Sequence, residues 1–331
     1  MIEVNFIYDK ESKKEWNQFL FENDGSFLQS FEWGEFQQAL GKRIWRIKAR
    51  EEGNVMGQSL VIEETFPLKQ KTCFYIPFGP VLRQGLPADK QKEAVKAILG
   101  EIQNCALSPR RAVFLKIEPH TELILPEGLT VSVPDRRIQP QKTLILDLLQ
   151  EEDEIFRNFS SKNRYNIGLA QRKGVKIKFE GQYRKEFYHL MKKTSERDGF
   201  APFKEEHYKK LFEITSDDFK VKLCLADYGD KIIASYVLIL FGKTAIGLHG
   251  ANDWQYRALK AANLLQWERI KLVKGLGCEK FDFWGIDEKK WQGITDFKKG
   301  FGGTELVHPP SKDIVFQKGW YKLYNIARRV I

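Results

Sequence analysis

The stretch Lys220–Gly250 reads KVKLCLADYGDKIIASYVLILFGKTAIGLHG, and it decides the fold. The apolar runs Lys220–Ala226 and Ile232–Phe241 lie on either side of the turn residues Asp227–Asp230, and a third run, Thr244–Gly250, follows directly. Short apolar runs separated by Gly and Asp residues predict strands joined by tight turns. This stretch is therefore expected to form a meander of three antiparallel strands.

The residues after the meander continue the pattern. A helix is predicted at Leu259–Val273, and Lys280–Trp284 is predicted to return as a strand. The first half of the chain repeats this order of elements without useful sequence identity. Its strands are predicted at Arg43–Arg50, Val55–Glu63, Thr72–Phe78 and Ala112–Ile117, with a helix at Asp89–Leu107. Further helices are predicted before each meander, at Lys13–Glu22, Glu32–Leu40, Lys185–Arg197 and Glu205–Thr215.

The order of these elements resembles the core of the GNAT acyltransferase fold. We therefore predict an α/β (α+β) protein with two tandem GNAT-like acyltransferase domains. The strand Thr143–Leu148 is expected to end the first domain, so that the acidic stretch Gln150–Glu154 begins the second. The first domain is expected to cover residues 1–146 together with a C-terminal segment, 306–331, that packs back on it, and the second to cover 147–305.

Composition restricts the class of protein. The 331 residues are 42% hydrophobic and 30% charged, as in globular proteins, and 54 basic against 44 acidic residues give a net charge of +10. Such a charge favours anionic partners, namely nucleic acid, nucleotide-sugar diphosphates or an acidic membrane face. The four cysteines form no CxxC pair and the five histidines show no ligand spacing, so we expect core thiols and no metal site. No Ser/His/Asp constellation supports a hydrolase.

The cellular location is predicted from apolar segments. The N-terminal stretch Met1–Trp16 is charged and lacks the apolar core of a secretion signal. The run Ile232–Phe241 is about half the length needed to cross a bilayer. We therefore expect a cytoplasmic protein, and we also expect it to be a monomer. Its amphipathic C-terminal helix, Trp320–Ile331, carries basic residues and is expected to contact the inner face of the membrane.

A series of motifs, each weak alone, follows in one order along the chain. They are FLQSFEW (27–33), FGPV (78–81), KNRYNI (162–167), QRKGV (171–175), RDGF (197–200) within Thr194–Tyr208, HGA (249–251), LLQW (264–267), FDFWGI (281–286) and FKKGFGG (297–303). In this order they resemble the FemABX family of tRNA-dependent peptidoglycan-bridge aminoacyltransferases. The resemblance runs from about Phe19 to the C-terminus. No heptad run lies between Lys185 and Phe297, so the chain resembles the short form of the family, without a coiled-coil arm.

The resemblance implies transfer of an amino acid from aminoacyl-tRNA to the stem-peptide amine of a peptidoglycan precursor. The acceptor would be UDP-MurNAc-peptide or lipid II, and aminoacyl-tRNA would be the donor substrate, with no further cofactor. Lys298, next to Phe297, corresponds to the family's catalytic lysine and is expected to meet the oxyanion of the transition state. Spacing alone favours a solvated lysine beside Lys299, whereas the resemblance favours the catalytic role.

The same resemblance implies a set of acceptor-binding residues. Lys204 and Tyr208 correspond to an Arg–Tyr pair that holds the precursor, and four-residue spacing predicts that they share one helix face. Lysine keeps the charge of arginine but loses its fork. Gln37 corresponds to a phosphate-contacting lysine, Glu118 to an aspartate near the precursor and His249 to a tyrosine.

A basic stretch, Ile155–Lys178, contains seven Lys and Arg residues and no acidic residue. Aromatic residues interleave with the cations, as in surfaces that contact RNA phosphates and bases. We expect tRNA contacts from Lys162, Arg164, Arg172 and Lys173. A solvated basic helix face is the alternative interpretation.

Three rival functions remain open. An acetyl-CoA-type N-acyltransferase would share the fold, but such enzymes cradle pyrophosphate with a Gly-rich loop, and Arg257–Ala262 carries Lys260 in place of its first glycine. A tRNA-protein transferase would share the donor. A non-catalytic RNA-binding module would lack the chemistry of Lys298.

Overall fold

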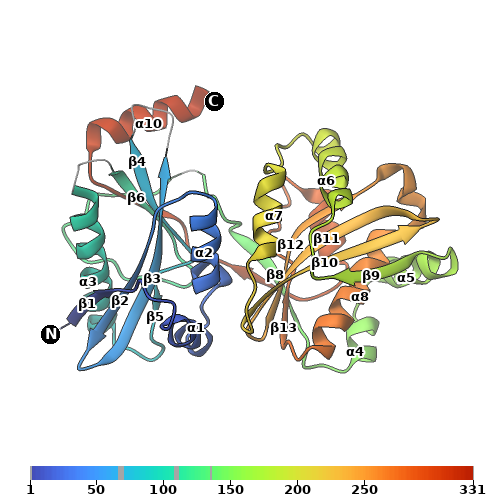
Figure 1. The fold of residues 1–331 in the computed structure, drawn as a ribbon, viewed down its shortest axis with the longest axis horizontal. Helices are drawn as coiled ribbons and strands as arrows, with labels where there is room; N and C mark the ends of the chain where they lie inside the picture. The colour runs from blue at the N-terminus through green and yellow to red at the C-terminus, as the bar shows by residue number, and fades with distance from the viewer. Residues whose placement is uncertain (1, 66–70, 108–111, 135, 331) are drawn as a thin grey trace. The chain divides into compact units, whose positions relative to one another are not determined.

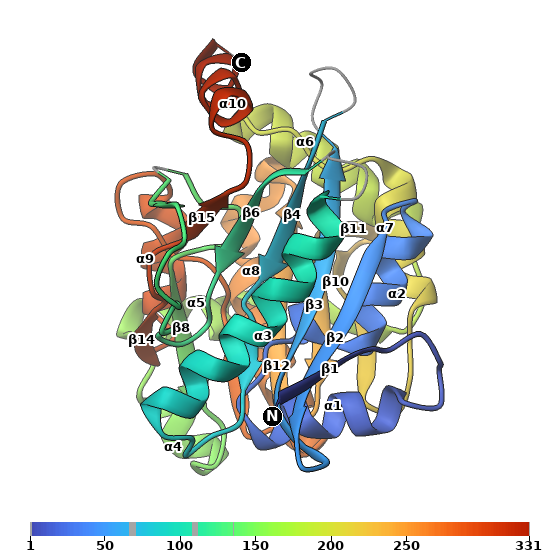
Figure 2. The same cartoon turned by 90° about the vertical axis from the view of Figure 1, so that its left-hand side faces the viewer.

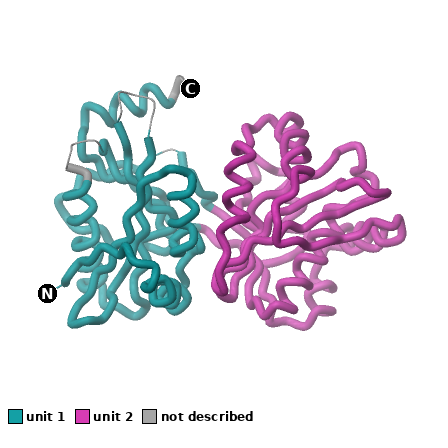
Figure 3. The backbone as a smooth tube through the Cα atoms, viewed as in Figure 1, with its two compact units in different colours: residues 1–141, 308–331 teal, residues 142–307 magenta. Residues whose placement is uncertain are grey.

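The computed structural model describes residues 2–65, 71–107, 112–134 and 136–330. The chain forms two compact units (Figure 3), one made of residues 1–141 and 308–331 and the other of residues 142–307. Each unit contains one mixed β-sheet with helices packed against it (Figure 1). Among the described residues, no helix is long and apolar enough to cross a membrane.

Unit 1 is built on a sheet with the strand order β1-β2-β3-β4-β6-β15-β7, and β5 pairs with β3. The strands are β1 (Ile2–Phe6), β2 (Ile44–Glu51), β3 (Asn54–Thr65), β4 (Thr72–Pro77), β5 (Val81–Leu82), β6 (Ala112–Glu118), β7 (Val131–Ser132) and β15 (Lys312–Val315). The helices are α1 (Lys13–Glu22), η1 (Phe27–Gln29), α2 (Phe31–Ala39), α3 (Ala88–Leu107) and α10 (Lys318–Val330).

Helix α3 crosses one face of this sheet (Figure 2), and α1 and α2 lie against the other (Figure 1). Apolar residues recur along α3 at helical spacing, at Val95, Ile98, Leu99 and Ile102, and all four are buried against the sheet. The parallel pair β4–β6 follows because α3 carries the chain back across the sheet between them.

Unit 2 is built on the strand order β14-β8-β13-β12-β11-β10-β9. Its strands are β8 (Lys142–Asp147), β9 (Lys176–Glu180), β10 (Phe219–Tyr228), β11 (Lys231–Phe241), β12 (Thr244–Asn252), β13 (Lys280–Asp282) and β14 (Thr304–Val307). Its helices are α4 (Glu152–Arg157), α5 (Ser161–Arg172), α6 (Lys185–Asp198), α7 (Glu205–Glu213), η2 (Trp254–Leu259), α8 (Ala261–Gly275) and α9 (Gln292–Lys299).

The predicted repeat is present. The meander β2-β3-β4, the helix α3 and the parallel strand β6 correspond to β10-β11-β12, α8 and the parallel strand β13. This confirms the prediction of two GNAT-like folds in tandem. Several elements of the structure were not predicted, among them the edge strands β1 and β14 and the helix α9.

The boundary between the domains differs from the expected one. The prediction that a strand at Thr143–Leu148 ends the first domain is wrong, because β8 pairs with β13 and β14 of unit 2. Unit 2 therefore begins at Lys142 and extends to Val307. The C-terminal segment belongs to unit 1, where β15 pairs with β6. The predicted C-terminal helix begins two residues earlier, at Lys318, and Ile331 lies outside the described residues.

Candidate active site

Lys298 lies on α9, in the last turn of the helix. Its side chain points inward, and the residue is only 8% exposed. The Nζ atom donates hydrogen bonds to the carbonyl oxygens of Gly285, at 2.6 Å, and Trp284, at 3.2 Å. These contacts exclude the interpretation of Lys298 as a solvated surface lysine. The next residue, Lys299, is exposed and pairs with Glu288 and Glu305.

The surroundings of Lys298 bring the pKa of its side chain closer to neutral pH. Burial lowers the pKa of Lys298 to about 8, although the nearby Asp282 carboxylate opposes the shift. Burial raises the pKa of Asp282 to about 6, against the hydrogen bonds that it accepts from Thr143 and from the Trp284 N–H. An acid and a base with such values in one place are typical of a functional site.

A buried arginine on α8 belongs to the same surroundings. Arg269 is 1% exposed, and its guanidinium carbon lies 3.4 Å from the centroid of the Tyr236 ring. Its Nη2 donates to Gln266, whereas Nε and Nη1 have no hydrogen-bond partner among the described residues. Arg269 also opposes the protonation of Lys298. Sequence reasoning missed this residue, although a charge among the apolar positions of α8 was the available signal.

Phe297 packs against the hydrophobic core of unit 2. Its ring meets the Phe301 ring edge to face, with the centroids 5.1 Å apart. Its carbonyl oxygen accepts a hydrogen bond from the Asn163 side chain at 3.5 Å. Phe297 thereby ties α9 to α5 and helps to fix the helix that carries Lys298.

Tyr208 and His249 lie in one aromatic cluster in unit 2. Their ring centroids are 5.5 Å apart, and Phe203, which stacks on His207, contacts both rings. Burial raises the pKa of Tyr208 to about 12 and, with a contribution from His207, lowers that of His249 to about 3. Both side chains are therefore neutral near pH 7, so they offer hydrogen bonds and not charge.

Lys204 does not share a helix face with Tyr208. It is the N-cap residue of α7 and is exposed, whereas Tyr208 is buried within the helix. The prediction of one shared face is wrong because Lys204 has extended backbone angles, with φ −61° and ψ 151°, and precedes the helical turn. Its side chain is exposed and directly follows Phe203, which belongs to the aromatic cluster.

The two predicted residues of unit 1 are both buried. Gln37 is 5% exposed on α2, and its Oε1 has no hydrogen-bond partner among the described residues. The Glu118 carboxylate accepts hydrogen bonds from the Tyr75 hydroxyl at 2.8 Å and from the backbone N–H groups of Ile138 and Gln139, at 2.6 and 2.8 Å. Glu118 therefore holds the segment around 138–139 in place.

The predicted tRNA-binding residues lie on α5 and at its C-terminal end. Lys162, Arg172 and Lys173 are exposed, and Arg172 lies over the exposed ring of Tyr165, with 6.0 Å from guanidinium carbon to centroid. Arg164 differs, because its guanidinium donates to the carbonyl oxygens of Arg157 and Phe159 and so joins α4 to α5.

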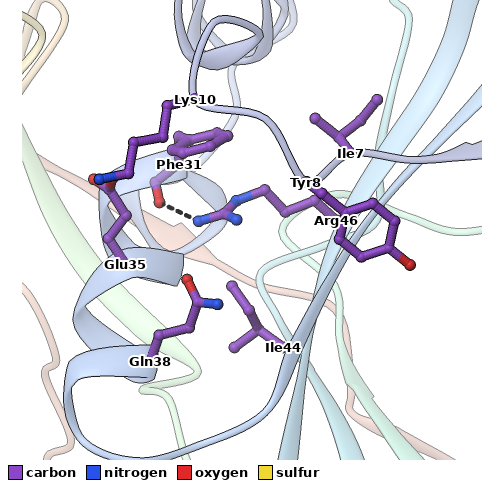
Figure 4. A pocket seen from close by; sticks show the side chains of 8 residues that line it. All are labelled: Ile7, Tyr8, Lys10, Phe31, Glu35, Gln38, Ile44 and Arg46. Carbon is purple, nitrogen blue, oxygen red and sulfur yellow. Dashed lines mark hydrogen bonds between the residues drawn. The ribbon is translucent and has the colours of Figure 1, made fainter.

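A hollow of about 90 Å³ lies in unit 1, beside α2 (Figure 4). Its most buried charge, Arg46, lies 3.7 Å from the centroid of the Phe31 ring and donates to the Phe31 carbonyl oxygen at 2.8 Å. Burial lowers the pKa of Arg46 to about 10. The hollow contains none of the predicted site residues, so it does not define the candidate active site.

Each unit has the meander, the helix and the parallel return strand of a GNAT-like fold, so the chain has a tandem GNAT-like fold. The model of the FemAB family matches residues 12–126, 124–230 and 225–329, and the chain belongs to that family. A relative in Staphylococcus haemolyticus, a lipid II:glycine glycyltransferase, is 22% identical over 384 residues, which cover 91% of this chain and 90% of that protein. The enzyme of the same name in Staphylococcus aureus is 26% identical over 294 residues, covering 82% of this chain and 67% of that protein.

Solved structures show the same fold. The crystal structure of FemX superimposes with a TM-score of 0.79 at 20% identity, covering 97% of this chain and 99% of that one. A tandem GNAT protein from the clavulanic acid biosynthesis pathway superimposes with a TM-score of 0.56 at 10% identity, covering 95% of this chain and 97% of that one.

Proposed function

We propose that this protein transfers an amino acid from aminoacyl-tRNA to the stem-peptide amine of a peptidoglycan precursor, as an aminoacyltransferase of interpeptide bridge formation. The observation that carries the proposal is the buried Lys298 ammonium. Two of its three N–H groups donate hydrogen bonds to the carbonyl oxygens of Trp284 and Gly285, and the third can donate to a substrate. The relatives named as lipid II:glycine glycyltransferases support the choice of acceptor.

The reaction needs no covalent enzyme intermediate. The acceptor amine attacks the ester carbonyl carbon of the aminoacyl-tRNA, and the carbonyl oxygen becomes an oxyanion that the Lys298 ammonium stabilises. Collapse of the tetrahedral intermediate forms the amide C–N bond and breaks the C–O bond to the tRNA ribose. The amine loses a proton, and the leaving ribose oxygen gains one, so that the products are the extended stem peptide and free tRNA.

The precursor would be held by the aromatic cluster of unit 2. The Tyr208 hydroxyl and the neutral His249 ring offer hydrogen bonds to a peptide, and the exposed Lys204 offers a charge to a phosphate. Lys204→Ala should raise the KM for the precursor by about tenfold and leave the KM for aminoacyl-tRNA unchanged. Equal effects on both constants would remove Lys204 from acceptor binding.

The direct test uses a mixed aminoacyl-tRNA pool with UDP-MurNAc-pentapeptide or with lipid II, followed by mass analysis of the acceptor. A mass increase of one aminoacyl residue is expected. Lys298→Met should lower kcat by about a hundredfold while both substrates still bind. Lys299→Met is the matched control, since Lys299 is exposed at the same helix end, and its kcat should stay within about twofold.

The rival functions give different products in the same assay. Labelling of a protein N-terminus instead of the precursor would identify a tRNA-protein transferase, and acetylation from acetyl-CoA would identify an N-acetyltransferase. Lys260 adopts a left-handed conformation, with φ 56°, at the N-terminus of α8, so its side chain occupies the position where that class needs a bare backbone. Binding of tRNA without any transfer would identify an RNA-binding module.

We also propose that the protein is a cytoplasmic monomer that reaches a membrane-bound acceptor through α10. Leu323 and Ile326 are 51% and 61% exposed on this helix, next to the exposed Lys322. Apolar and basic side chains on one exposed face suit an anionic lipid surface. Co-sedimentation with phosphatidylglycerol vesicles should decrease in the variant Leu323→Ser/Ile326→Ser, and an unchanged bound fraction would contradict this contact.

A further inference from the structure

The chain makes a tight excursion directly after β13. The backbone N–H of Phe283 donates a hydrogen bond to the carbonyl oxygen of Leu144 at 3.0 Å. The backbone N–H of Ile286 donates to the carbonyl oxygen of Lys142 at 2.9 Å. Both acceptors lie on β8, so the two ends of the segment are fixed to one strand. Trp284 and Gly285, between these ends, bulge away from β8.

The bulge is held by a side chain and not by the sheet. Asp282 Oδ1 accepts a hydrogen bond from the Trp284 N–H at 2.7 Å, which closes an Asx turn. The Thr143 hydroxyl, from the neighbouring strand β8, donates to the same oxygen. Trp284 adopts φ 61°, a left-handed conformation that costs a non-glycine residue conformational free energy. The Asx turn supplies the local hydrogen bond that compensates for this cost.

The bulge determines how Lys298 is oriented. It turns the carbonyl oxygens of Trp284 and Gly285 toward Lys298 Nζ, which donates to both. An ammonium on a flexible four-carbon chain is otherwise free to rotate. Two fixed acceptors set the direction of its third N–H group, which is the group that would meet the oxyanion.

We propose that Asp282 and Thr143 are positioning residues that hold the Trp284–Gly285 bulge in the shape that aims the Lys298 ammonium at the reacting carbonyl. The proposal rests on the proposed function, since it assigns these residues through Lys298. Neither residue needs to touch a substrate.

Charge provides a second link between Asp282 and Lys298. Among the described residues, the charged groups that act on Lys298 are Asp282, from β13, and Arg269, from α8. On α9 itself, Lys299 is engaged at the surface by Glu288 and Glu305. The Asp282 carboxylate favours the protonated amine and Arg269 disfavours it. Removal of the Asp282 charge should therefore lower the pKa of Lys298.

Two pairs of variants separate geometry from charge. Asp282→Asn keeps an oxygen for the Trp284 N–H but loses the charge, whereas Asp282→Ala loses both. Thr143→Ser keeps the hydroxyl, whereas Thr143→Val removes it at nearly constant volume. Circular dichroism and urea unfolding of each variant show which of them are folded.

The expected kinetics follow from these roles. Asp282→Ala should lower kcat by about a hundredfold, with both KM values within about twofold of the wild type. Thr143→Val should lower kcat by about tenfold and Thr143→Ser by less than about twofold. Asp282→Asn should keep most of its kcat near pH 6.5 but lose activity about one pH unit earlier on the alkaline side. A folded Asp282→Ala or Thr143→Val variant with unchanged kcat would overturn the proposal.

A readout independent of transfer distinguishes this proposal from the proposed function. Acetic anhydride labelling of Lys298, followed by mass spectrometry across pH, reports the pKa of its amine in the intact protein. The pKa should fall by about one unit in Asp282→Asn and stay constant in Thr143→Ser. If the wild type transfers nothing but the labelling shift is present, the proposed function fails and the coupling of Asp282 to Lys298 stands. If the wild type is active and Asp282→Asn shows no shift in labelling, the coupling fails.

Discussion

Lys298 is a residue whose protonation should control the rate. Because burial lowers its pKa to about 8, the ammonium predominates below that value and is lost as the pH rises through it. We expect the kcat for transfer to fall on the alkaline side with an apparent pKa of about 8, ten times lower for each further pH unit. The measurement is a pH profile under saturating substrates between pH 6 and 10.

The matched variants make this pH profile specific to Lys298. Lys299→Met should keep the alkaline limb, whereas the residual activity of Lys298→Met should lack it. An alkaline limb that persists in Lys298→Met would assign the titration to another group. Asp282 would be excluded in turn by its pKa of about 6, because that carboxyl is already ionised where the limb begins.

Gln29 and Gly79 lie in two separate motifs of unit 1, FLQSFEW (27–33) and FGPV (78–81), and they pack against each other. The Gln29 side chain bonds to the backbone of Leu60 and to the Pro77 carbonyl, and a Cβ atom on Gly79 would lie 2.6 Å from the Gln29 amide carbon. The amide cannot move without breaking these buried bonds. Gly79→Ala should therefore lower the free energy of unfolding by about 3 kcal/mol, measured by urea denaturation.

Gly100→Ala is the control for this substitution. Gly100 is exposed on α3 and has no atom within 4 Å of an added Cβ. Alanine there should raise the free energy of unfolding by about 0.5–1 kcal/mol, because glycine is a poor helix former. Similar effects of the two substitutions would show that Gly79 is not constrained by Gln29.

The roles of single residues were only partly predictable from the sequence. Lys298 and Asp282 both lie in recognised motifs, but the role of Asp282 depends on Thr143, which is far from it along the chain. Glu118 shows the opposite case: its position matched a precursor-binding residue, and the structure places three internal hydrogen bonds on its carboxylate. Hydrogen-bond partners that are distant in sequence leave no local pattern.

Helices and strands were predicted where periodicity was strong. The meander strands and the helices α1, α3 and α6 lie within about two residues of their predicted ranges. The strands are apolar runs bounded by turn residues, and the helices repeat apolar residues at helical spacing. Helix α9 was missed since Gly293 and its polar residues resemble a loop. The strand β8 was found but assigned to the wrong domain, because a strand's sequence does not specify its partner.

Helix α5 carries a prediction about tRNA at the scale of one element. Arg172 and Lys173 are exposed at its C-terminal end, so Arg172→Ala/Lys173→Ala should weaken tRNA binding and reduce the log–log salt slope by about one to two units. The slope of log binding constant against log salt concentration is measured by filter binding between about 50 and 300 mM salt. Counterion release dominates tRNA binding in roughly this range.

Arg164 serves as the contrast on the same helix. Its guanidinium is engaged by the carbonyls of Arg157 and Phe159, so Arg164→Ala should lower the stability of unit 2 more than it changes the salt slope. A slope that stays at the wild-type value in Arg172→Ala/Lys173→Ala would show that this end of α5 is merely solvated.

At the scale of the whole molecule, each sheet is completed by a strand from a distant part of the sequence. In unit 2, β8 pairs with β13, although β8 is the first element of that unit and β13 lies near its end. In unit 1, β15 pairs with β6, although all of unit 2 lies between them in the sequence. Unit 1 therefore cannot be completed until the chain has passed through unit 2. This dependence was foreseen only as a C-terminal segment packing back, because β15 has four residues and no clear apolar alternation.

The junction between β15 and β6 contains a buried ion pair that makes the dependence measurable. Lys116 and Asp313 are 2% and 1% exposed, and Nζ lies 2.8 Å from Oδ1, while the Tyr321 hydroxyl donates to Oδ2 at 2.9 Å. Asp313→Ala would leave the Lys116 ammonium buried without its partner, which should cost about 3–5 kcal/mol of unfolding free energy. Tyr321→Phe removes one hydrogen bond to a charge and should cost about 2 kcal/mol. Urea denaturation followed by tryptophan fluorescence measures both.

The double variant Lys116→Met/Asp313→Leu separates the charge from the strand pairing. It removes both charges together, so it should recover most of the stability lost in Asp313→Ala, because apolar side chains of similar size replace the pair. If the double variant is as unstable as Asp313→Ala, the loss reflects the packing of β15 and not the uncompensated charge. If Asp313→Ala itself loses less than about 1 kcal/mol, water reaches Lys116 and the junction is not closed in solution.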